Sequence, residues 1–183
     1  LSEMPSSLIP LQPLGKMWNH TYNSYITEIT GDVKRPDDYR VIVALPNSGF
    51  HIFKRDGGGF KAVTQGVYNT LQRPTADKFT ITTKNQIVYT YQKIEGTAES
   101  FPFVLSHIQD RNGNTLAVNY EDSKNPKTEN HKRISQVVGT SGRKLQFSYH
   151  PTSDLVKDIT DPLGRKITFS YDANDTPKLT SFA

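Results

Sequence analysis

The chain has 183 residues, no cysteine, and 22 basic against 18 acidic side chains, which gives a formal net charge of +4 at pH 7. This length suits one globular domain or a stretch of a larger repetitive one, and it is sufficient to fold without a disulfide or a metal. The absence of cysteine excludes a disulfide framework, a cysteine-ligated zinc site and a thiol nucleophile. Only 34% of the residues are hydrophobic, and no window of the sequence approaches a membrane span.

The excess of positive charge does not predict nucleic-acid binding. The basic residues are dispersed along the chain, and their small clusters are only pairs, such as Lys54-Arg55 and Arg165-Lys166. A nucleic-acid surface concentrates basic residues on one face and interleaves them with stacking aromatic rings. We therefore expect a solvated basic surface and no nucleic-acid partner. The chain begins with Leu1 and carries no apolar targeting segment, so we interpret it as an excerpt from a longer chain.

Short runs of alternating residues predict β-strands along most of the chain, because they are rich in Val, Ile, Thr, Tyr and Phe. In chain order, the predicted strands cover residues 40–45, 50–54, 78–82, 87–91, 104–109, 116–120, 144–149, 156–160 and 166–171. Polar loops are predicted over residues 93–102 and 121–132. There is almost no helical periodicity, and 12 glycines and 11 prolines punctuate the runs. We therefore predict an all-β fold.

A run of three glycines, Gly57 to Gly59, follows Asp56. A phosphate-binding loop would also need a Lys-Ser or Lys-Thr pair and a following helix, and neither is present in the sequence. We interpret this run as a flexible hairpin tip.

The most informative pattern is an internal repeat in the second half of the chain. A tyrosine follows each of three glycines by seven residues, in the pairs Gly113 and Tyr120, Gly142 and Tyr149, and Gly164 and Tyr171. Apolar residues stand three and five positions after each glycine, and small or polar residues stand between them. Each segment is therefore predicted to be a strand with one apolar and one polar face. The apolar residues are Leu116 and Val118, Leu145 and Phe147, and Ile167 and Phe169.

A second apolar pattern precedes each glycine. One apolar residue lies five positions before the glycine and another lies three positions earlier, in the pairs Leu105 and Ile108, Ile134 and Val137, and Val156 and Ile159. Each unit therefore reads as strand, tight turn, strand. A fourth unit begins with Leu179 and Phe182 and is cut off at Ala183.

The turn between the two strands of each unit has a consistent composition. Asp161-Pro162-Leu163-Gly164 has Asp, Pro and Gly at the positions that suit a type I turn closed by a left-handed glycine. Residues 110–113 and 139–142 occupy the same place in their units.

These segments resemble the YD repeats of the Rhs family, in which Gly-Arg, an alternating strand and Tyr-Asp follow one another. The resemblance is carried by ITDPLGRKITFSYDAN (residues 159–174), IQDRNGNTLAVNYED (108–122) and GRKLQFSYH (142–150). His150 stands where the family has Asp, and Asn114 stands where it has Arg. Further upstream, PLGKMWNHTYNSYI (13–26) resembles the segment that opens many such regions, with a Leu-Gly-x-x-Trp motif before a Tyr-rich strand. SGFHIFKRDGGGFKA (48–62) and KNQIVYTYQ (84–92) resemble the degenerate early strands.

The resemblance implies a fold more directly than it implies a chemical activity. Consecutive antiparallel β-hairpins of this family lie side by side in a continuous curved or spiralling sheet, which closes as a hollow β-shell. Residues 1–103 would be an N-terminal Rhs-type region with degenerate hairpins, and residues 104–183 would be about three YD repeats and a truncated fourth. In bacteria such a shell often encloses a C-terminal toxic domain, and in animals similar repeats occur in cell-adhesion proteins.

The resemblance also implies a structural, non-enzymatic role in an exported protein, secreted or at the cell surface. The partners would be the remainder of the parent chain, with further repeats and an enclosed toxin-like domain. Some members release their cargo with an aspartic-protease-like site beyond the last repeats, but no segment of this chain matches that region. No catalytic, cofactor-binding or metal-binding residue is predicted, and no cofactor. The alternative is an open β module that binds a cell-surface carbohydrate or protein, for which the rings of Tyr120, Tyr149 and Tyr171 would have to be exposed and not packed.

Two sets of residues contain side chains that can bind metals. Asp110, Asn112, Asn114 and Glu121 match positions of a calcium loop, but the glycine falls at the fourth position instead of the sixth, and a strand is predicted within the loop. We therefore interpret Asn112-Gly113 as a hairpin turn. The five histidines lack the spacing of metal ligands and are expected to be structural or exposed.

Overall fold

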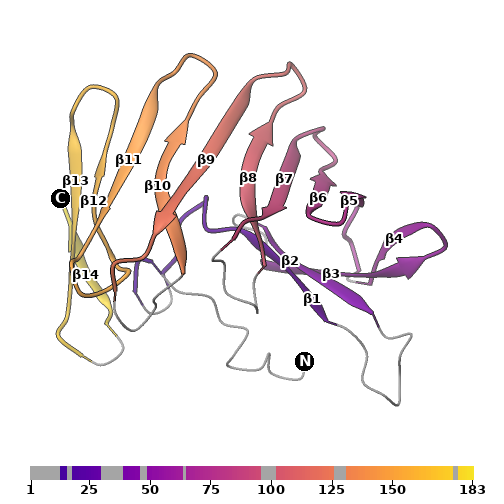
Figure 1. Cartoon of the computed structure of the whole chain (residues 1–183), viewed down its shortest axis with the longest axis horizontal. Helices are drawn as coiled ribbons and strands as arrows, with labels where there is room; N and C mark the ends of the chain where they lie inside the picture. The colour runs from indigo at the N-terminus through magenta and orange to yellow at the C-terminus, as the bar shows by residue number, and fades with distance from the viewer. Residues whose placement is uncertain are drawn as a thin grey trace. The chain divides into compact units, whose positions relative to one another are not determined.

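The computed structural model describes residues 13–15, 18–29, 39–45, 49–63, 65–95, 102–125, 131–174 and 177–183. These residues form fourteen β-strands connected by turns and loops (Figure 1). The predicted all-β fold is confirmed, because the described residues form strands and no helix, and every pair of strands given below is antiparallel. No helix in this part of the chain is long and apolar enough to cross a membrane.

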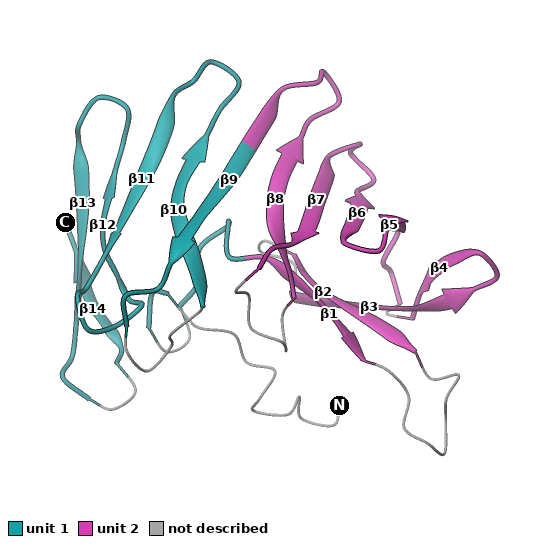
Figure 2. Cartoon of the chain, viewed as in Figure 1, with its two compact units in different colours: residues 1–23, 117–183 teal, residues 24–116 magenta. Residues whose placement is uncertain are grey.

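The chain divides into two compact units (Figure 2). Residues 24–116 form one unit, and residues 1–23 together with residues 117–183 form the other. The boundary falls within a strand, β9, and the N-terminal segment belongs to the unit of the C-terminal hairpins. The boundaries of the compact units therefore differ from residue 103, where the family resemblance places the end of the N-terminal region. That division of the chain stays a prediction.

The unit of residues 24–116 contains eight strands in the order β4-β3-β2-β1-β8-β7-β6-β5. Their bounds are β1 (Tyr25–Ile29), β2 (Arg40–Leu45), β3 (Gly49–Asp56), β4 (Gly59–Ala62), β5 (Thr70–Thr75), β6 (Lys78–Thr82), β7 (Val88–Lys93) and β8 (Phe103–Gln109). Side chains of β1–β4 contact side chains of β5–β8, since the rings of Phe60 and Phe79 lie 6.0 Å apart. The side chains buried in this unit include Ile26, Val41, Val43, Phe53, Leu71, Phe79, Ile81, Tyr91 and Leu105.

Arg73 on β5 lies over this core. Its guanidinium donates to Glu28 on β1 at 2.7 Å, and its Cζ lies 4.8 Å from the centre of the Phe79 ring. The salt bridge therefore links β5 to β1, and the cation also contacts an aromatic face.

The second unit contains β9 (Thr115–Asp122), β10 (Lys132–Val138), β11 (Lys144–Tyr149), β12 (Val156–Thr160), β13 (Lys166–Tyr171) and β14 (Leu179–Phe182). Each of these strands pairs with the next one along the chain. This is the hairpin-by-hairpin arrangement that the internal repeat predicts. Closure of such hairpins into a hollow shell stays a prediction.

The N-terminal segment packs against these hairpins. Pro13 accepts a hydrogen bond from the backbone N–H of Val156 at 2.8 Å, and Leu14 is buried. The ring of His20 lies 5.4 Å from the ring of Phe147 on β11. A segment distant in sequence thus contributes to the apolar core of this unit.

All nine strands predicted from alternation are present, and their ends agree to within two residues. The run Asp56–Gly59 forms the tip of the β3–β4 hairpin, as predicted. Five strands have no counterpart among those nine. β10 and β14 lie in the repeat units that the apolar spacing predicts, whereas β1, β4 and β5 are not predicted by alternation. β1 is buried on both faces at its start and does not alternate, β4 has four residues, and β5 contains Pro74 and a single buried apolar residue, Leu71.

The predicted loop over residues 121–132 is too long. β9 continues through Asp122 and β10 already begins at Lys132, because these two residues pair across the strands and form an ion pair of 2.5 Å. The loop predicted over residues 93–102 begins within β7, which ends at Lys93. Residues 96–101 and 126–130 lie outside the described part of the chain.

Candidate functional site in the repeated hairpins

The tips of the β8–β9, β10–β11 and β12–β13 hairpins have the same backbone structure. In each, the N–H of the first turn residue donates to the carbonyl of the residue four positions later, and the glycine N–H donates back to the first residue. The first residues are Asp110, Gly139 and Asp161, and these hydrogen bonds measure 2.8 to 3.1 Å. Gly113, Gly142 and Gly164 have φ values of 86°, 76° and 81°. The predicted left-handed glycine turns are therefore confirmed.

An aspartate side chain stabilises two of these turns. The carboxylate of Asp110 accepts hydrogen bonds from the backbone N–H groups of Asn112 and Asn114 and from the Asn114 amide, at 2.8 to 2.9 Å. The bond from the Asn114 side chain, together with the backbone bonds, lowers the pKa of Asp110. Asp161 makes the equivalent bonds to Leu163 and Arg165. The carboxylate that imitated a calcium ligand is thus bonded within its own turn, as the hairpin interpretation requires.

A β-bulge recurs in the first strand of every repeat. One residue has no partner across the strands, and in the four units it is Ser106, Ser135, Lys157 and Thr180. The bulge shifts the alternation by one residue, so apolar residues three positions apart lie on the same face of the sheet. This geometry accounts for the spacing of three between Ile134 and Val137 and in each equivalent pair.

In three units the side chain of the bulged residue hydrogen-bonds to a backbone carbonyl of the neighbouring strand. Ser106 donates its hydroxyl to the carbonyl of Thr90 at 3.1 Å, Ser135 to that of Asn119 at 3.2 Å, and Thr180 to that of Ser170 at 3.0 Å. The acceptors occupy equivalent places, since each is paired with the residue that follows the bulge. Lys157 has no hydroxyl, so the third unit lacks this bond.

Two of the three repeated tyrosines, Tyr149 and Tyr171, close the open ends of their hairpins. The hydroxyl of Tyr149 donates to the carbonyl of Ile134 at 2.6 Å, and that of Tyr171 to the carbonyl of Val156 at 2.8 Å. In both units the acceptor is the first apolar residue, fifteen positions before the tyrosine. Both rings are half-buried, and burial raises the pKa of Tyr171 to about 12. These phenols are therefore protonated donors at physiological pH.

A partly buried ionic cluster lies beside Tyr149. The Arg133 guanidinium lies 4.3 Å from the centre of the Tyr149 ring, 2.9 Å from Glu121 and 3.4 Å from Asp154. Asp154 is 8% exposed and also accepts a 2.5 Å hydrogen bond from Ser123. The cluster therefore joins the loop after β9 to the loop after β11. Every charge in it has a partner, which is typical of a structural network.

A polar contact links three strands on the other face of the sheet. Asp158 on β12 accepts hydrogen bonds from Ser148 on β11 at 3.1 Å and from Thr168 on β13 at 2.7 Å. The bond from Thr168, followed by that from Ser148 and the nearby Lys166 cation, lowers the pKa of Asp158. The aspartate therefore serves as a cross-strand acceptor.

Four of the five histidines each contact a different residue. His20 contacts Phe147 and His150 contacts Tyr171, while His51 hydrogen-bonds to Asn69 and His107 to Ser106. Among the described residues, no group of three or more His, Asp or Glu side chains is arranged to hold a metal ion.

Sequence comparisons add no identification. Models of known protein families give no match to this chain, and no curated protein matches it. The resemblance to YD repeats therefore rests on the motifs quoted above.

Proposed function

We propose that this chain is a structural, non-enzymatic repeat segment whose hairpins form part of a larger β-sheet wall. The observation that carries the proposal is the recurrence of one local design, a glycine turn, a bulged first strand and a terminal tyrosine. The glycine turns of three units, the bulged residues of three units and the tyrosines of two units hydrogen-bond to backbone of their own or the adjacent strand. Such a design extends a sheet one unit at a time, as in other repeat proteins.

The last strand supports an extension of the sheet. β14 has the sequence Leu179-Thr180-Ser181-Phe182, with the bulge and the apolar spacing of the earlier first strands. Within the described residues it pairs with β13 alone. Apolar side chains on and beside this strand are exposed, with Ile167 at 48% and Phe182 at 65%. In the proposal, a further hairpin of the parent protein pairs with β14.

The motif resemblance extends the proposal to the Rhs family. On this view the wall is part of a hollow shell that encloses or presents a C-terminal, toxin-like domain of a secreted or cell-surface protein. The remainder of the parent chain would be the partner of this segment.

The environment of the tyrosines favours the structural role over an open sugar-binding module. A stacking platform needs exposed rings, whereas Tyr149 and Tyr171 are half-buried and donate their hydroxyls to backbone carbonyls. Arg133 lies on the Tyr149 ring and His150 on the Tyr171 ring, so part of each ring is already in contact.

Limited proteolysis of the full parent protein tests this function, with the segment C-terminal to the repeats followed by immunoblot. If the repeats form a closed wall, the C-terminal segment survives until the repeats themselves are cut. If that segment is digested while the repeats remain intact, the repeats form an open scaffold and the proposal fails.

A further inference from the structure

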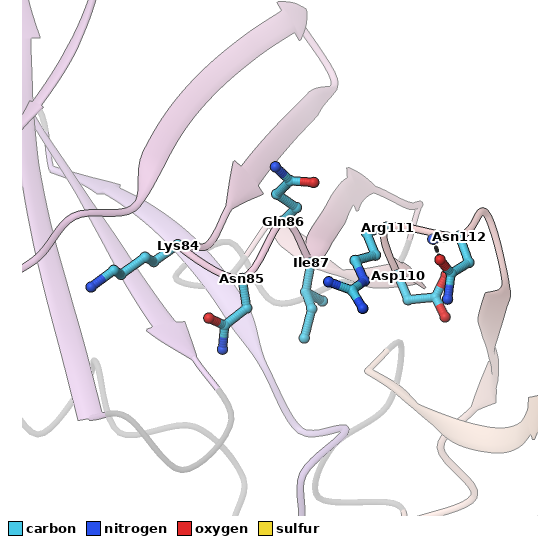
Figure 3. A pocket seen from close by; sticks show the side chains of 7 residues that line it. All are labelled: Lys84, Asn85, Gln86, Ile87, Asp110, Arg111 and Asn112. Carbon is cyan, nitrogen blue, oxygen red and sulfur yellow. Dashed lines mark hydrogen bonds between the residues drawn. The ribbon is translucent and has the colours of Figure 1, made fainter.

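Two neighbouring hairpin tips, β6–β7 and β8–β9, have the same turn structure and carry an asparagine at the same position. In the β6–β7 turn the N–H of Thr83 donates to the carbonyl of Ile87, and the N–H of Gln86 donates back to Thr83, both at 2.9 Å. This is the hydrogen-bond pattern of the glycine turns. Asn85 therefore stands in this turn where Asn112 stands in the β8–β9 turn, and both line an open hollow between the tips (Figure 3).

The two turns differ in the residue that follows the asparagine. Gly113 follows Asn112 and has a φ of 86°, whereas Gln86 follows Asn85 and has a φ of 61°. Among the described residues, Gln86 is the only residue other than glycine with a positive φ. The left-handed position thus has no Cβ in one turn and a long side chain in the other, while the backbone hydrogen bonds of the two turns are equivalent.

The carboxamide of Asn112 is exposed and unbound. The backbone N–H of this residue donates to the Asp110 carboxylate at 2.8 Å, but its carboxamide has no hydrogen-bond partner within the described part of the chain (Figure 3). The nearby Asn114 differs, because its carboxamide donates to Asp110 at 2.8 Å. The Asn112 side chain can therefore turn toward the backbone nitrogen of Gly113 without breaking a bond of its own.

From this arrangement we infer that Asn112 is a site of spontaneous deamidation. The backbone nitrogen of Gly113 bonds to Cγ of Asn112, and the bond from Cγ to the side-chain nitrogen breaks. The proton of the Gly113 N–H passes through solvent to that nitrogen, which leaves as ammonia, and a cyclic succinimide remains. Water then opens the ring at either carbonyl and gives aspartate or isoaspartate, without any oxidation or reduction. Glycine permits the attack because it has no Cβ beside the reacting nitrogen.

The turn limits the rate of this reaction and is altered by its product. The Gly113 N–H donates to the Asp110 carbonyl at 3.1 Å, and the Asp110 carboxylate accepts from the N–H groups of Asn112 and Asn114. These bonds must open before the Gly113 nitrogen can reach the carboxamide. Isoaspartate lengthens the backbone by a methylene group, so the bonds to Asp110 cannot all re-form. The inference does not depend on the structural role proposed for the repeats.

Incubation of the folded chain at pH 8, followed by peptide mass spectrometry, tests the inference with Asn85 as the internal control. Trypsin cuts after the basic residue before each asparagine, Arg111 and Lys84, and so releases the two asparagines in separate peptides. Conversion to aspartate and isoaspartate is expected to be about tenfold or more faster at Asn112 than at Asn85, because the Cβ of Gln86 obstructs the attack. The unincubated chain corrects for conversion during digestion. Equal rates at the two asparagines, or no conversion at Asn112, would overturn the inference.

Two variants separate the role of glycine from the stability of the turn. Gln86→Gly is expected to raise the rate at Asn85 by about tenfold or more, since glycine suits the φ of 61° and removes the obstructing Cβ. Asp110→Ala removes the carboxylate that holds the β8–β9 turn and is expected to raise the rate at Asn112 by about threefold or more. Circular dichroism shows that each variant is folded. An unchanged rate at Asn85 in the first variant, or a slower one at Asn112 in the second, would contradict the inference.

Discussion

Gly15 and Gly164 have nearly the same backbone conformation, with φ values of 80° and 81°, but their surroundings differ. A Cβ at Gly164 would meet no atom within 4 Å, so only the left-handed backbone requires glycine there. A Cβ at Gly15 would lie 2.7 Å from the carbonyl oxygen of Pro177 and 3.3 Å from the Tyr171 ring. Gly15 therefore serves two purposes, a turn and a close approach between segments distant in sequence.

We predict that Gly164→Ala lowers the free energy of unfolding by about 1 kcal/mol, the cost of a left-handed alanine. Gly15→Ala should cost clearly more, on the order of 2–4 kcal/mol, because the clash with backbone adds to that strain. Chemical denaturation of both variants and the wild type measures the difference. Equal losses at the two positions would contradict the close packing of the N-terminal segment.

His20 gives the folded chain a dependence on pH. Burial against Phe147 lowers the pKa of His20 from 6.5 to about 4, so the folded chain binds this proton only in acid, whereas the unfolded chain binds it near pH 6.5. Between these values the unfolded state holds more protons, and stability falls as the pH falls. The loss attributable to His20 reaches up to about 3 kcal/mol at pH 4.

Thermal unfolding between pH 7.5 and pH 4.5 measures this effect. His20→Gln should show a shallower decline in Tm than the wild type. His107→Gln, which replaces an exposed histidine, should keep the wild-type decline. Identical pH profiles for all three proteins would exclude His20 as the titrating group.

At the scale of elements, the sequence contains two signals of the recurrent bulge that strict alternation does not capture. The spacing of three between Ile134 and Val137 conflicts with strict alternation, and a bulge at Ser135 resolves the conflict. The serine or threonine at three of the four bulges is a second signal. Alternation alone therefore locates the strands, while a departure from alternation locates their irregularities.

We predict that Ser135→Ala lowers stability by about 1 kcal/mol, because the hydroxyl bond to the Asn119 carbonyl is lost. Lys157→Ser should raise stability by about 0.5–1 kcal/mol, because it supplies the hydroxyl that the third unit lacks. Ser141→Ala, in an exposed turn, is the matched control and should be neutral. Urea denaturation compares the three, and a destabilised Lys157→Ser variant would show that the bulges are not equivalent.

The hydroxyl of Tyr149 offers a test of hairpin closure. Tyr149→Phe removes only the bond to the Ile134 carbonyl and should cost about 1–2 kcal/mol, since that carbonyl loses a partner in a half-buried site. Tyr68→Phe, at a tyrosine that is 79% exposed, should leave stability unchanged. The melting temperatures of the two variants measure the contrast, and no loss in Tyr149→Phe would refute the closing role of the tyrosine.

The sequence pattern predicts the fold class, the turns and the faces of the strands, because these depend on local chemistry. It does not predict the contacts of Arg133, whose partners, Glu121 on β9 and Asp154 in the loop after β11, lie 12 and 21 residues away. It also does not predict the left-handed Gln86, because glutamine has no special preference for that conformation. Local sequence patterns thus predict the repeated hairpin, whereas the ionic contacts between distant residues cannot be predicted from them.

For the whole molecule, we propose that the hairpin unit can be propagated beyond β14. Thr168 and Ala183 exchange both backbone hydrogen bonds, at 2.9 and 3.1 Å, so strand pairing continues to the last residue. By the repeat spacing, a turn is due immediately after Ala183. A copy of residues 161–172 joined at that point would place its glycine five positions after Phe182 and its tyrosine fifteen positions after Leu179.

The most direct measurement is the melting temperature of the chain with this copy appended, compared with the chain alone. We predict a rise of about 4 °C or more, because the added strand pairs with β14 and covers Phe182. The control carries one additional alanine before the copy, which shifts the register by one residue and turns the apolar side chains to the opposite face. A higher melting temperature for the chain with the in-register copy, and an unchanged one for the control, would support a sheet that extends by successive hairpins. Equal melting temperatures in all three chains would contradict it.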